Sequence, residues 1–370
     1  MSEQRFSISI SLPSLLVTGL LLLLTVLVWQ VRGLLLIVMT SVIVAAAIAP
    51  IVDQFEQWRF PRWLATLVAY IGLISTLVGV GLLAGPTIVE QVESLIRQVP
   101  TFIEVVRRLL EAGAARLGET QSELISELFD PQAISRWALG SSRQLVLRSY
   151  GLTRNILGTV FSAVLVLFLS GYMVADNRTL LNGLVRLLPQ PWEDRFAAQV
   201  RPVGSRMGGY IRGRLLVSIV LGVGITIGLS FLGLKDYAIG LGAIAAVTNL
   251  VPFIGPILGS VPALLVALSV GGWAPLWVLI LFVVVQNLET YVLDPLLVGS
   301  SVGIHPLYQL LAVLSGAQLL GIIGALIIPP WFAGVAVLVE NLYLRPKVLA
   351  ERRQVVLATA APAVAAAEAD

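Results

Sequence analysis

The chain has 370 residues, of which 57% are hydrophobic and only 12% are charged, and its formal net charge is +3. Soluble domains carry about 25% charged residues, so this composition excludes an ordinary soluble domain and indicates a polytopic α-helical membrane protein. Cysteine is absent and His305 is the only histidine, which excludes disulfides and multi-histidine zinc centres. We therefore expect neither a metal nor a cofactor.

The basic residues argue against two further classes of function. Neither of the two lysines, Lys235 and Lys347, follows a glycine, so the chain lacks a G-K-[ST] phosphate loop and we expect no ATP hydrolysis by that route. The arginines flank apolar runs, where they set topology and meet anionic head groups. The lipid bilayer, rather than nucleic acid, is therefore the expected partner of the positive charge.

Apolar runs of about 20 residues predict membrane-spanning helices. The first two flank Gln30-Val31-Arg32-Gly33, which we interpret as a tight turn, and Pro50 is expected to end the second. Three runs make up an N-terminal region at residues 1–85. The first five runs of the chain are Leu12–Trp29, Leu34–Ile51, Leu64–Ala84, Ile156–Val174 and Leu215–Leu232.

The segment Pro86–Arg148 differs in kind, because apolar positions at helical spacing are interleaved with charged residues. We predict a small amphipathic helical domain at residues 86–150, outside the hydrocarbon. Two interpretations stay open: helices that lie on the membrane surface, or an oligomer contact or cap over a pathway. The residues that divide the segment into two or three helices are Gly118, Asp130-Pro131 and Gly140.

The distribution of arginine predicts the orientation in the membrane. Residues 176–214 form a strongly basic segment, and short arginine-rich loops stay cytoplasmic. The same rule places the loop with Arg59 and the tail with Arg345 inside. We therefore expect both termini in the cytoplasm, the amphipathic domain outside, and a disordered cytoplasmic tail at residues 350–370.

The stretch Tyr237–Gly272 is apolar enough for a bilayer but cannot form a plain helix. Pro252 and Pro256 each remove a backbone donor, Gly255 lies between them, and Asn249 lies just upstream. In hydrocarbon such a break survives only against protein or a water-filled cavity, and it points to a transport site. Free carbonyls and the Asn249 amide could bind a cation or a solute hydroxyl, and a hinge without a ligand is the alternative.

A second interrupted run, Leu307–Leu344, repeats this theme. We expect its glycines and prolines to serve close packing or hinge motion rather than binding. Each interrupted run could cross the membrane as a broken helix or fold back as a re-entrant hairpin, and charge counting does not separate the two. The interrupting residues are Gly316, Gly321, Gly324 and Pro329.

Glu289 is the strongest single candidate for chemistry, because an ionisable group at membrane depth is costly and is a functional hypothesis by default. Gln286 would share its helix face and Asn287 lies nearby, so this group could bind a cation or exchange a proton. The alternative is that Glu289 has reached the interface and only ends a helix. We interpret Asp294-Pro295 as a helix cap and His305 as an ordinary loop residue.

These motifs resemble the autoinducer-2 exporter family of bacterial permeases. The resemblance implies a multi-pass protein of the cytoplasmic membrane with about eight spans, a homo-oligomer, and transport sites in the C-terminal region at residues 151–349. Family members are similar to exporters of small polar signals, and some are similar to sodium(lithium)/proton antiporters. The motifs that carry the resemblance are Asn249-Leu250-Val251-Pro252-Phe253-Ile254-Gly255-Pro256, Gln286-Asn287-Leu288-Glu289 with Asp294-Pro295, His305-Pro306 and Gly321-Ile322-Ile323-Gly324-Ala325.

Three hypotheses about function follow. A secondary transporter would move a small polar solute, or exchange monovalent cations, by alternating access around the two interrupted runs. A non-transporting scaffold would act through the outer domain at residues 86–150. We do not expect an enzyme, because the single histidine has no serine motif such as G-x-S-x-G near it.

Overall fold

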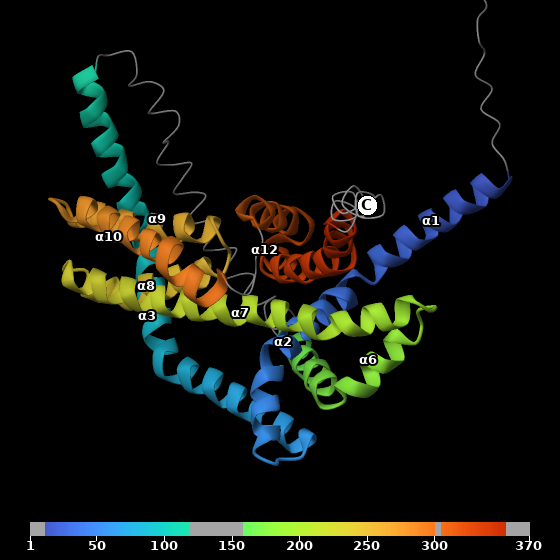
Figure 1. Ribbon diagram of the computed structural model, residues 1–370. Coiled ribbons are helices and arrows are strands. Elements are labelled where there is room, and N and C mark those ends of the chain that lie inside the picture. Colours follow the sequence, from blue (N-terminus) through green and yellow to red (C-terminus); the bar gives the residue numbers. More distant parts are fainter. Residues whose placement is uncertain (1–11, 118–157, 300–304, 353–370) are drawn as a thin grey trace, which may run out of the picture.

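The computed structural model describes residues 12–117, 158–299 and 305–352, and every regular element within these ranges is a helix (Figure 1). Six of the described helices are long and apolar enough to cross a membrane. This confirms the all-helical, multi-span class, whereas the total of about eight spans stays a prediction. The six are Arg32–Gln57, Arg62–Arg108, Gly158–Ala175, Trp192–Phe231, Ala274–Val298 and Pro306–Arg352.

The N-terminal helices α1 (Leu12–Gln30) and α2 (Arg32–Gln57) are separated by Val31 alone. The amide and the carbonyl of Val31 both make helical hydrogen bonds to residues four positions away, each 3.0 Å long. The tight turn predicted at Gln30-Val31-Arg32-Gly33 is therefore wrong. The chain bends at this point, and α2 leads on from α1 rather than folding back along it (Figure 1).

Pro50 does not end α2, which runs on beyond it. Because proline has no N–H, the carbonyl of Ala46 loses its helical donor. Arg212 of the helix α7 (Trp192–Phe231) supplies a replacement, since its Nη1 donates to the carbonyl oxygens of Ala46 at 3.2 Å and Ala47 at 2.9 Å. This contact satisfies the interrupted backbone and fixes α2 against α7.

The helix α3 (Arg62–Leu117) has 56 residues and passes through Pro86 without interruption. Its amphipathic half packs against the C-terminal part of the molecule, where Leu95 and Phe102 enter a shared core with α7 and the helices that follow it.

The separate domain predicted at residues 86–150 stays a prediction, because the described part of it continues α3 directly. Its expected divisions at Gly118, Asp130-Pro131 and Gly140 lie outside the described residues, as does most of the tail predicted at residues 350–370.

The long helix α7 is the element on which the others converge. A helix over Gly158–Ala175 and the short α6 (Asn177–Val185) lead into it, and α2, α8, α10 and α12 pack against it. Glycines let α7 lie close to these neighbours and to the π-helix η2 (Glu289–Gly299), because a Cβ at each position would collide with an atom of the partner. The pairs are Gly208 with Ala46, Gly213 with Leu297, Gly222 with Ala246 and Gly228 with Leu281.

The first interrupted run is a helical hairpin made of α8 (Lys235–Asn249) and α9 (Ile254–Val270). Two contacts establish that the helices run antiparallel, because a later residue of α9 contacts an earlier residue of α8. These are Gly255 against Thr248 and Gly259 against Ala245.

Residues 250–253 make the turn of this hairpin. Phe253 has a φ of 65°, a conformation that non-glycine residues seldom adopt. The turn is closed by its own backbone, since the Ile254 amide donates to the Pro252 carbonyl at 2.8 Å and the Gly255 amide to the Val251 carbonyl at 2.9 Å. The break predicted from the prolines is therefore a compact reversal of the chain.

The second interrupted run, in α12 (Pro306–Val339), also reverses direction. The reversal is at Gly321, whose φ of 66° and ψ of −150° are not helical. Two pairs show that the arms are antiparallel: Gly316 lies against Gly324, and the rings of Tyr308 and Phe332 stack with their centroids 6.3 Å apart.

The arms of the first hairpin are short. At about 1.5 Å per residue, α8 and α9 are about 22 and 25 Å long, whereas the hydrocarbon core of a bilayer is about 30 Å thick. In the second hairpin the first arm is about 22 Å long, but the second arm continues as helix through η3 (Glu340–Leu344) to residue 352. The antiparallel contacts show that both interrupted runs fold back, and neither continues in one direction as a broken helix.

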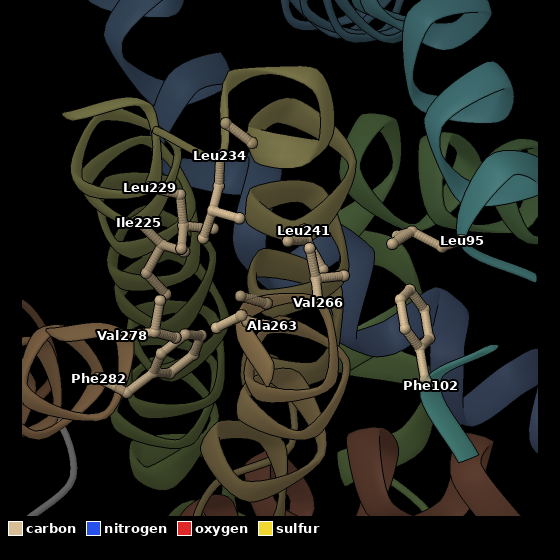
Figure 2. Close-up of a cluster of buried hydrophobic side chains, with 13 residues drawn as sticks. Leu95, Phe102, Ile225, Leu229, Leu234, Leu241, Ala263, Val266, Val278 and Phe282 are labelled. Atoms are coloured by element: carbon tan, nitrogen blue, oxygen red, sulfur yellow. The ribbon is translucent and has the colours of Figure 1, made fainter. Parts of the chain in front are cut away.

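A buried apolar cluster holds the first hairpin between α3, α7 and α10 (Ala274–Leu288), as Figure 2 shows. Apolar side chains from five helices interlock here, so displacement of the hairpin as a unit must separate it from α3, α7 or α10. The labelled members are Leu95, Phe102, Ile225, Leu229, Leu234, Leu241, Ala263, Val266, Val278 and Phe282.

We predict that Gly208→Ala destabilises the protein, because the added Cβ collides with the Ala46 carbonyl and forces α2 away from α7. Overpacking of this kind costs about 1–3 kcal/mol. The matched control is Gly204→Ala in the same helix, where a Cβ meets no atom within 4 Å. The midpoint of thermal unfolding in detergent should fall for Gly208→Ala alone, and equal midpoints would refute this packing.

We predict that Gly321→Ala is destabilising for a different reason. A Cβ there has free space, but the backbone conformation is one that only glycine adopts without strain, so the cost of about 1–3 kcal/mol is conformational. Gly224→Ala, which also has free space but lies in regular helix, should be neutral or stabilising. Thermal unfolding of both variants tests the reversal: the midpoint should fall for Gly321→Ala and should stay equal or rise for Gly224→Ala.

Candidate functional site

Three polar side chains from three elements meet in the interior beside the turn of the first hairpin. Arg214 lies in the middle of α7, Asn249 is the last residue of α8, and Glu289 begins the π-helix η2 (Glu289–Gly299). They are 4%, 3% and 3% exposed, respectively. We call these three residues the polar triad.

The polar triad is a closed set of interactions. Arg214 Nη1 lies 2.7 Å from Glu289 Oε1, and Arg214 Nη2 donates to Asn249 Oδ1 at 3.3 Å. Asn249 Nδ2 in turn donates to Glu289 Oε1 at 3.2 Å. The amide therefore bridges the two charged groups and fixes the end of α8 to both of them.

Local backbone structure explains why the three residues meet. Gly213 lies against the Leu297 carbonyl, which lets η2 approach α7 closely beside Arg214. Asn249 ends α8 because Pro252 prevents the helix from continuing as before. Glu289 lies where α10 gives way to η2, so a change in helix type coincides with the acid.

Asp294 is a further charged group beside the polar triad. Its Oδ1 lies 3.7 Å from Arg214 Nη1 and accepts no hydrogen bond from a described residue. In an α-helix, side chains five positions apart point about 140° away from each other. In a π-helix the backbone bonds join residues five apart, so Glu289 and Asp294 share a face. Asp294-Pro295 thus lies inside η2 and not at a helix end.

The charges at this site do not balance. Among the described residues Arg214 is the one guanidinium here, whereas Glu289 and Asp294 are two carboxylates, and Glu289 is as deeply buried as the arginine. Buried ions lose their hydration, which an ion pair offsets only with good geometry and further hydrogen bonds. Asn249 supplies such bonds to both members of the closer pair. Asp294 is 41% exposed and so keeps contact with the surroundings.

A cavity of about 20 Å³ adjoins the polar triad. Asn249, Pro256, Gln286 and Glu289 line it, together with apolar side chains of α7, α8 and α10. This volume is about what one water molecule needs. The site in this conformation therefore has room for one water or one dehydrated small cation beside Glu289, but not for an organic solute.

A second cavity, of about 370 Å³, lies between α7 and η3 (Glu340–Leu344), remote from the polar triad. It contains none of the binding residues predicted from the sequence. Its lining is Pro202, Ser205, Arg206, Val337, Glu340, Asn341 and Arg345.

The structure brings together most of the binding residues predicted from the sequence. Asn249, Pro256, Gln286 and Glu289 surround the small cavity. Asn287 does not join them, because it is exposed and its Nδ2 donates to the carbonyl one turn back in its own helix at 2.7 Å.

Two predicted residues shape the hairpin turn. Gly255 lies against the Thr248 carbonyl, where a Cβ would not fit, so it allows α9 to pack on α8. Pro252 is buried in the turn, and its carbonyl and that of Val251 already accept backbone hydrogen bonds. These two carbonyls are therefore part of the turn itself.

The residues predicted as hinge or packing positions lie in the second hairpin. Gly316 and Gly324 allow its two arms to touch, Gly321 makes the reversal, and Pro329 is buried in the second arm. None of them lines the small cavity. His305 begins α12, where its Nδ1 accepts a hydrogen bond from the Leu307 amide at 3.3 Å.

Sequence reasoning missed Arg214. It is the last member of the basic segment before an apolar run, so it was counted among the arginines that set topology. A signal was present, because Tyr210, Arg214 and Ser218 follow at intervals of four residues and so form a polar stripe on one helix face. All three are buried, and Gln309 of α12 donates to the Tyr210 hydroxyl at 3.4 Å.

Several apolar helices long enough to span a bilayer, with charged groups buried among them, define a multi-pass membrane transport protein. Residues 18–344 match the family described as AI-2E family transporter, and the chain belongs to this family. The resemblance expected from the interrupted runs is thereby confirmed.

Relatives in bacteria agree with this assignment. "Putative transport protein YrrI" of Bacillus subtilis is 31% identical over 291 residues, which cover 78% of this chain and 81% of the relative. YueF, a protein of the same organism with the same description, is 27% identical over 79% of this chain and 80% of its own length. MT0215 of Mycobacterium tuberculosis, again so described, is 26% identical over 80% of this chain and 79% of its own.

We predict that Arg214→Met lowers stability strongly, because it leaves the Glu289 carboxylate buried without its cation. Removing one partner of a buried ion pair costs about 3–5 kcal/mol. Arg201→Met, at an exposed position earlier in the same helix, is the control and should change stability little. Thermal unfolding in detergent measures both, and Arg214→Met with Glu289→Gln should recover part of the loss.

Proposed function

We propose that this protein is a secondary transporter that moves a small polar solute across the cytoplasmic membrane, with the polar triad as its central site. The observation that supports this most is a hydrogen-bonded Arg214–Glu289 pair, buried at the turn of an interrupted hairpin. Charged groups within membrane helices are expensive and cluster on solute and ion pathways. Interrupted helices at such a site are a common feature of secondary transporters.

The groups of this site suit a hydroxylated or otherwise polar solute. Arg214 offers donors, Glu289 offers acceptors, and Asn249 offers both. Gln286 adds an amide across the small cavity, and Pro256 gives that cavity a rigid wall. Because the cavity holds about one water, solute binding requires the α8–α9 turn to move away from Glu289.

Alternating access around the two hairpins provides that movement. Both hairpins contain a compact reversal, at residues 250–253 in one and at Gly321 in the other. Pro252 and Gly255 would keep the first turn rigid while it moves, and Gly316, Gly324 and Pro329 would keep the arms of the second packed. We propose that the first hairpin is re-entrant, since both of its arms are shorter than the hydrocarbon core, and that the second enters the membrane in the same way by its short first arm.

Exchange of monovalent cations for protons is the second candidate function. It is favoured by the excess of carboxylates over guanidinium at the site, because Asp294 and Glu289 face a single arginine. One of the two acids is then free to bind Na⁺, Li⁺ or a proton. A cation or proton gradient would also supply the energy that solute export requires, in keeping with the lack of a phosphate loop.

A scaffold that acts through an outer domain is the weakest candidate. The described amphipathic half of α3 uses its apolar face internally, with Leu95 and Phe102 in the core of the transport region. One of its polar side chains also faces inward, since Gln91 Oε1 accepts from the Gly240 amide at 2.6 Å. This segment is therefore better suited to support the first hairpin than to bind a separate partner.

Three further features belong to the proposal. Both termini would lie in the cytoplasm, the segment after residue 86 would lie outside, and the protein would be a homo-oligomer in the membrane. We also propose that it is not an enzyme, since neither the polar triad nor Asp294 is a nucleophile–base pair of the hydrolase kind.

We predict that Glu289→Gln abolishes coupled flux. In proteoliposomes with a pH-sensitive dye inside, a Na⁺ or Li⁺ pulse tests cation exchange, and labelled autoinducer-2 under a proton gradient tests solute movement. Loss of at least about tenfold in rate is expected, because the neutral amide can neither bind a cation by charge nor exchange a proton. Glu90→Gln, an exposed acid on α3, is the control.

If the wild type shows flux with either probe and Glu289→Gln shows the same rate, Glu289 has no part in the mechanism. Absence of wild-type flux with both probes would contradict these two substrates. A response to the cation pulse alone would favour the second candidate over the first.

A further inference from the structure

We propose that Arg214 exchanges partners between Glu289 and Asp294, so that Glu289 can be neutralised or occupied without leaving the buried guanidinium unpaired. Asp294 is thereby assigned a positioning role at the site, and it acts through Arg214. The inference rests on the proposed function for its role in transport, but the exchange itself is a property of the folded chain.

The distances place Arg214 between two acids. Its Nη1 makes the short contact to Glu289 Oε1, 2.7 Å, and lies only 3.7 Å from Asp294 Oδ1. That Oδ1 is buried and accepts no hydrogen bond from the described residues, and Arg214 Nε is likewise buried without an acceptor among them. A shift of the guanidinium by about 1 Å toward Asp294 would therefore give Asp294 Oδ1 the hydrogen-bond donor that it lacks.

The π-helix is what makes the second acid available. Five residues separate Glu289 from Asp294, and only a helix with bonds between residues five apart presents both carboxylates on one face. An α-helix would turn Asp294 away from α7. Insertions of this kind within helices are frequent at functional sites.

Burial explains why a second partner is needed. Arg214 is nearly inaccessible, so neutralisation of Glu289 by a proton or cation would leave an uncompensated charge in the interior. Asp294 is 41% exposed, so its carboxylate is less enclosed by protein than that of Glu289, while its Oδ1 faces the arginine. The energetic penalty of neutralising Glu289 is then much smaller than for an isolated pair.

The other groups around Arg214 cannot take this role. Asn249 Oδ1 already accepts from Nη2 and carries no charge. The Tyr210 hydroxyl accepts from Gln309 of α12, and Ser218 is a neutral hydroxyl one turn further along α7. Among the described residues, the charged groups that contact Arg214 are Glu289 and Asp294.

A double-mutant cycle in thermal stability tests the exchange. Glu289→Gln alone should lower the unfolding midpoint by only a few degrees, because Asp294 takes over the arginine, and Asp294→Asn should do the same while Glu289 holds it. The variant with both changes should lose clearly more than the sum of the two, because Arg214 is then unpaired. Additive effects would overturn the proposal.

A matched cycle on a more accessible arginine, whose side chain is 20% exposed, provides the control. Arg62 lies between Asp53 at 3.2 Å and Glu56 at 2.8 Å, with more exposed side chains. Asp53→Asn and Glu56→Gln should combine additively, because water can solvate this guanidinium. If the variant with both changes at Glu289 and Asp294 does not fold, addition of Arg214→Gln should restore folding, and failure of that rescue would also refute the proposal.

Flux measurements connect the exchange to transport. Asp294→Asn should slow cation-driven proton release in proteoliposomes by about tenfold or more, because Arg214 stays on Glu289, and Asp294→Glu should keep most of the rate. Asp294→Asn with wild-type rates would refute the role in transport. If the wild type shows no flux while the stability cycle is strongly non-additive, the proposed function fails and the partner exchange stands.

Discussion

The buried ion pair between Arg214 and Glu289 is the constraint on which the rest of the structure depends. Two charges without hydration are tolerated only if they pair closely and gain further hydrogen bonds, and so three separate elements must be held in register around them. Gly213 lets η2 reach α7, the prolines after Asn249 end α8 beside the pair, and the apolar core in Figure 2 holds the hairpin there. A change in any of these elements therefore alters the geometry of the ion pair.

Irregular backbone recurs in this protein, and three of the irregularities have an identifiable structural solution. Arg212 donates to the carbonyl that Pro50 frees, the turn of the first hairpin closes its own hydrogen bonds, and the reversal of the second uses a glycine conformation. In hydrocarbon an unsatisfied backbone group costs several kcal/mol, so these contacts are conditions for folding rather than refinements. They also concentrate the deformable points of the chain near α7.

The sequence was enough to predict the class of protein, the two interrupted runs, and Asn249 and Glu289 of the site. Proline and glycine positions are local signals, so the breaks near Asn249 and Gly321 could be predicted, whereas the direction of the chain after each break depends on tertiary packing. Asn287 was grouped with Glu289 by proximity, but its side chain bonds its own helix. Arg214 was missed because a buried arginine looks like a topogenic one in sequence. Asp294 was interpreted as a helix cap, because a π-helix arises from packing and leaves no periodic pattern.

The geometry of the site also constrains any transport cycle. Asn249 belongs to the hairpin that we propose to move and yet bonds both charges, so separation of the hairpin turn from Glu289 would remove hydrogen bonds from the ion pair at the moment the cavity opens. A solute that replaces the Asn249 amide, or a cation that replaces the Arg214 guanidinium, restores the interactions that the Glu289 carboxylate has lost. Water alone restores them less well in a confined apolar setting. Opening without a ligand is then unfavourable, which is the requirement for coupled rather than leaky movement. The tightness of coupling should consequently follow how well the ligand substitutes for Asn249 and Arg214 at the Glu289 carboxylate.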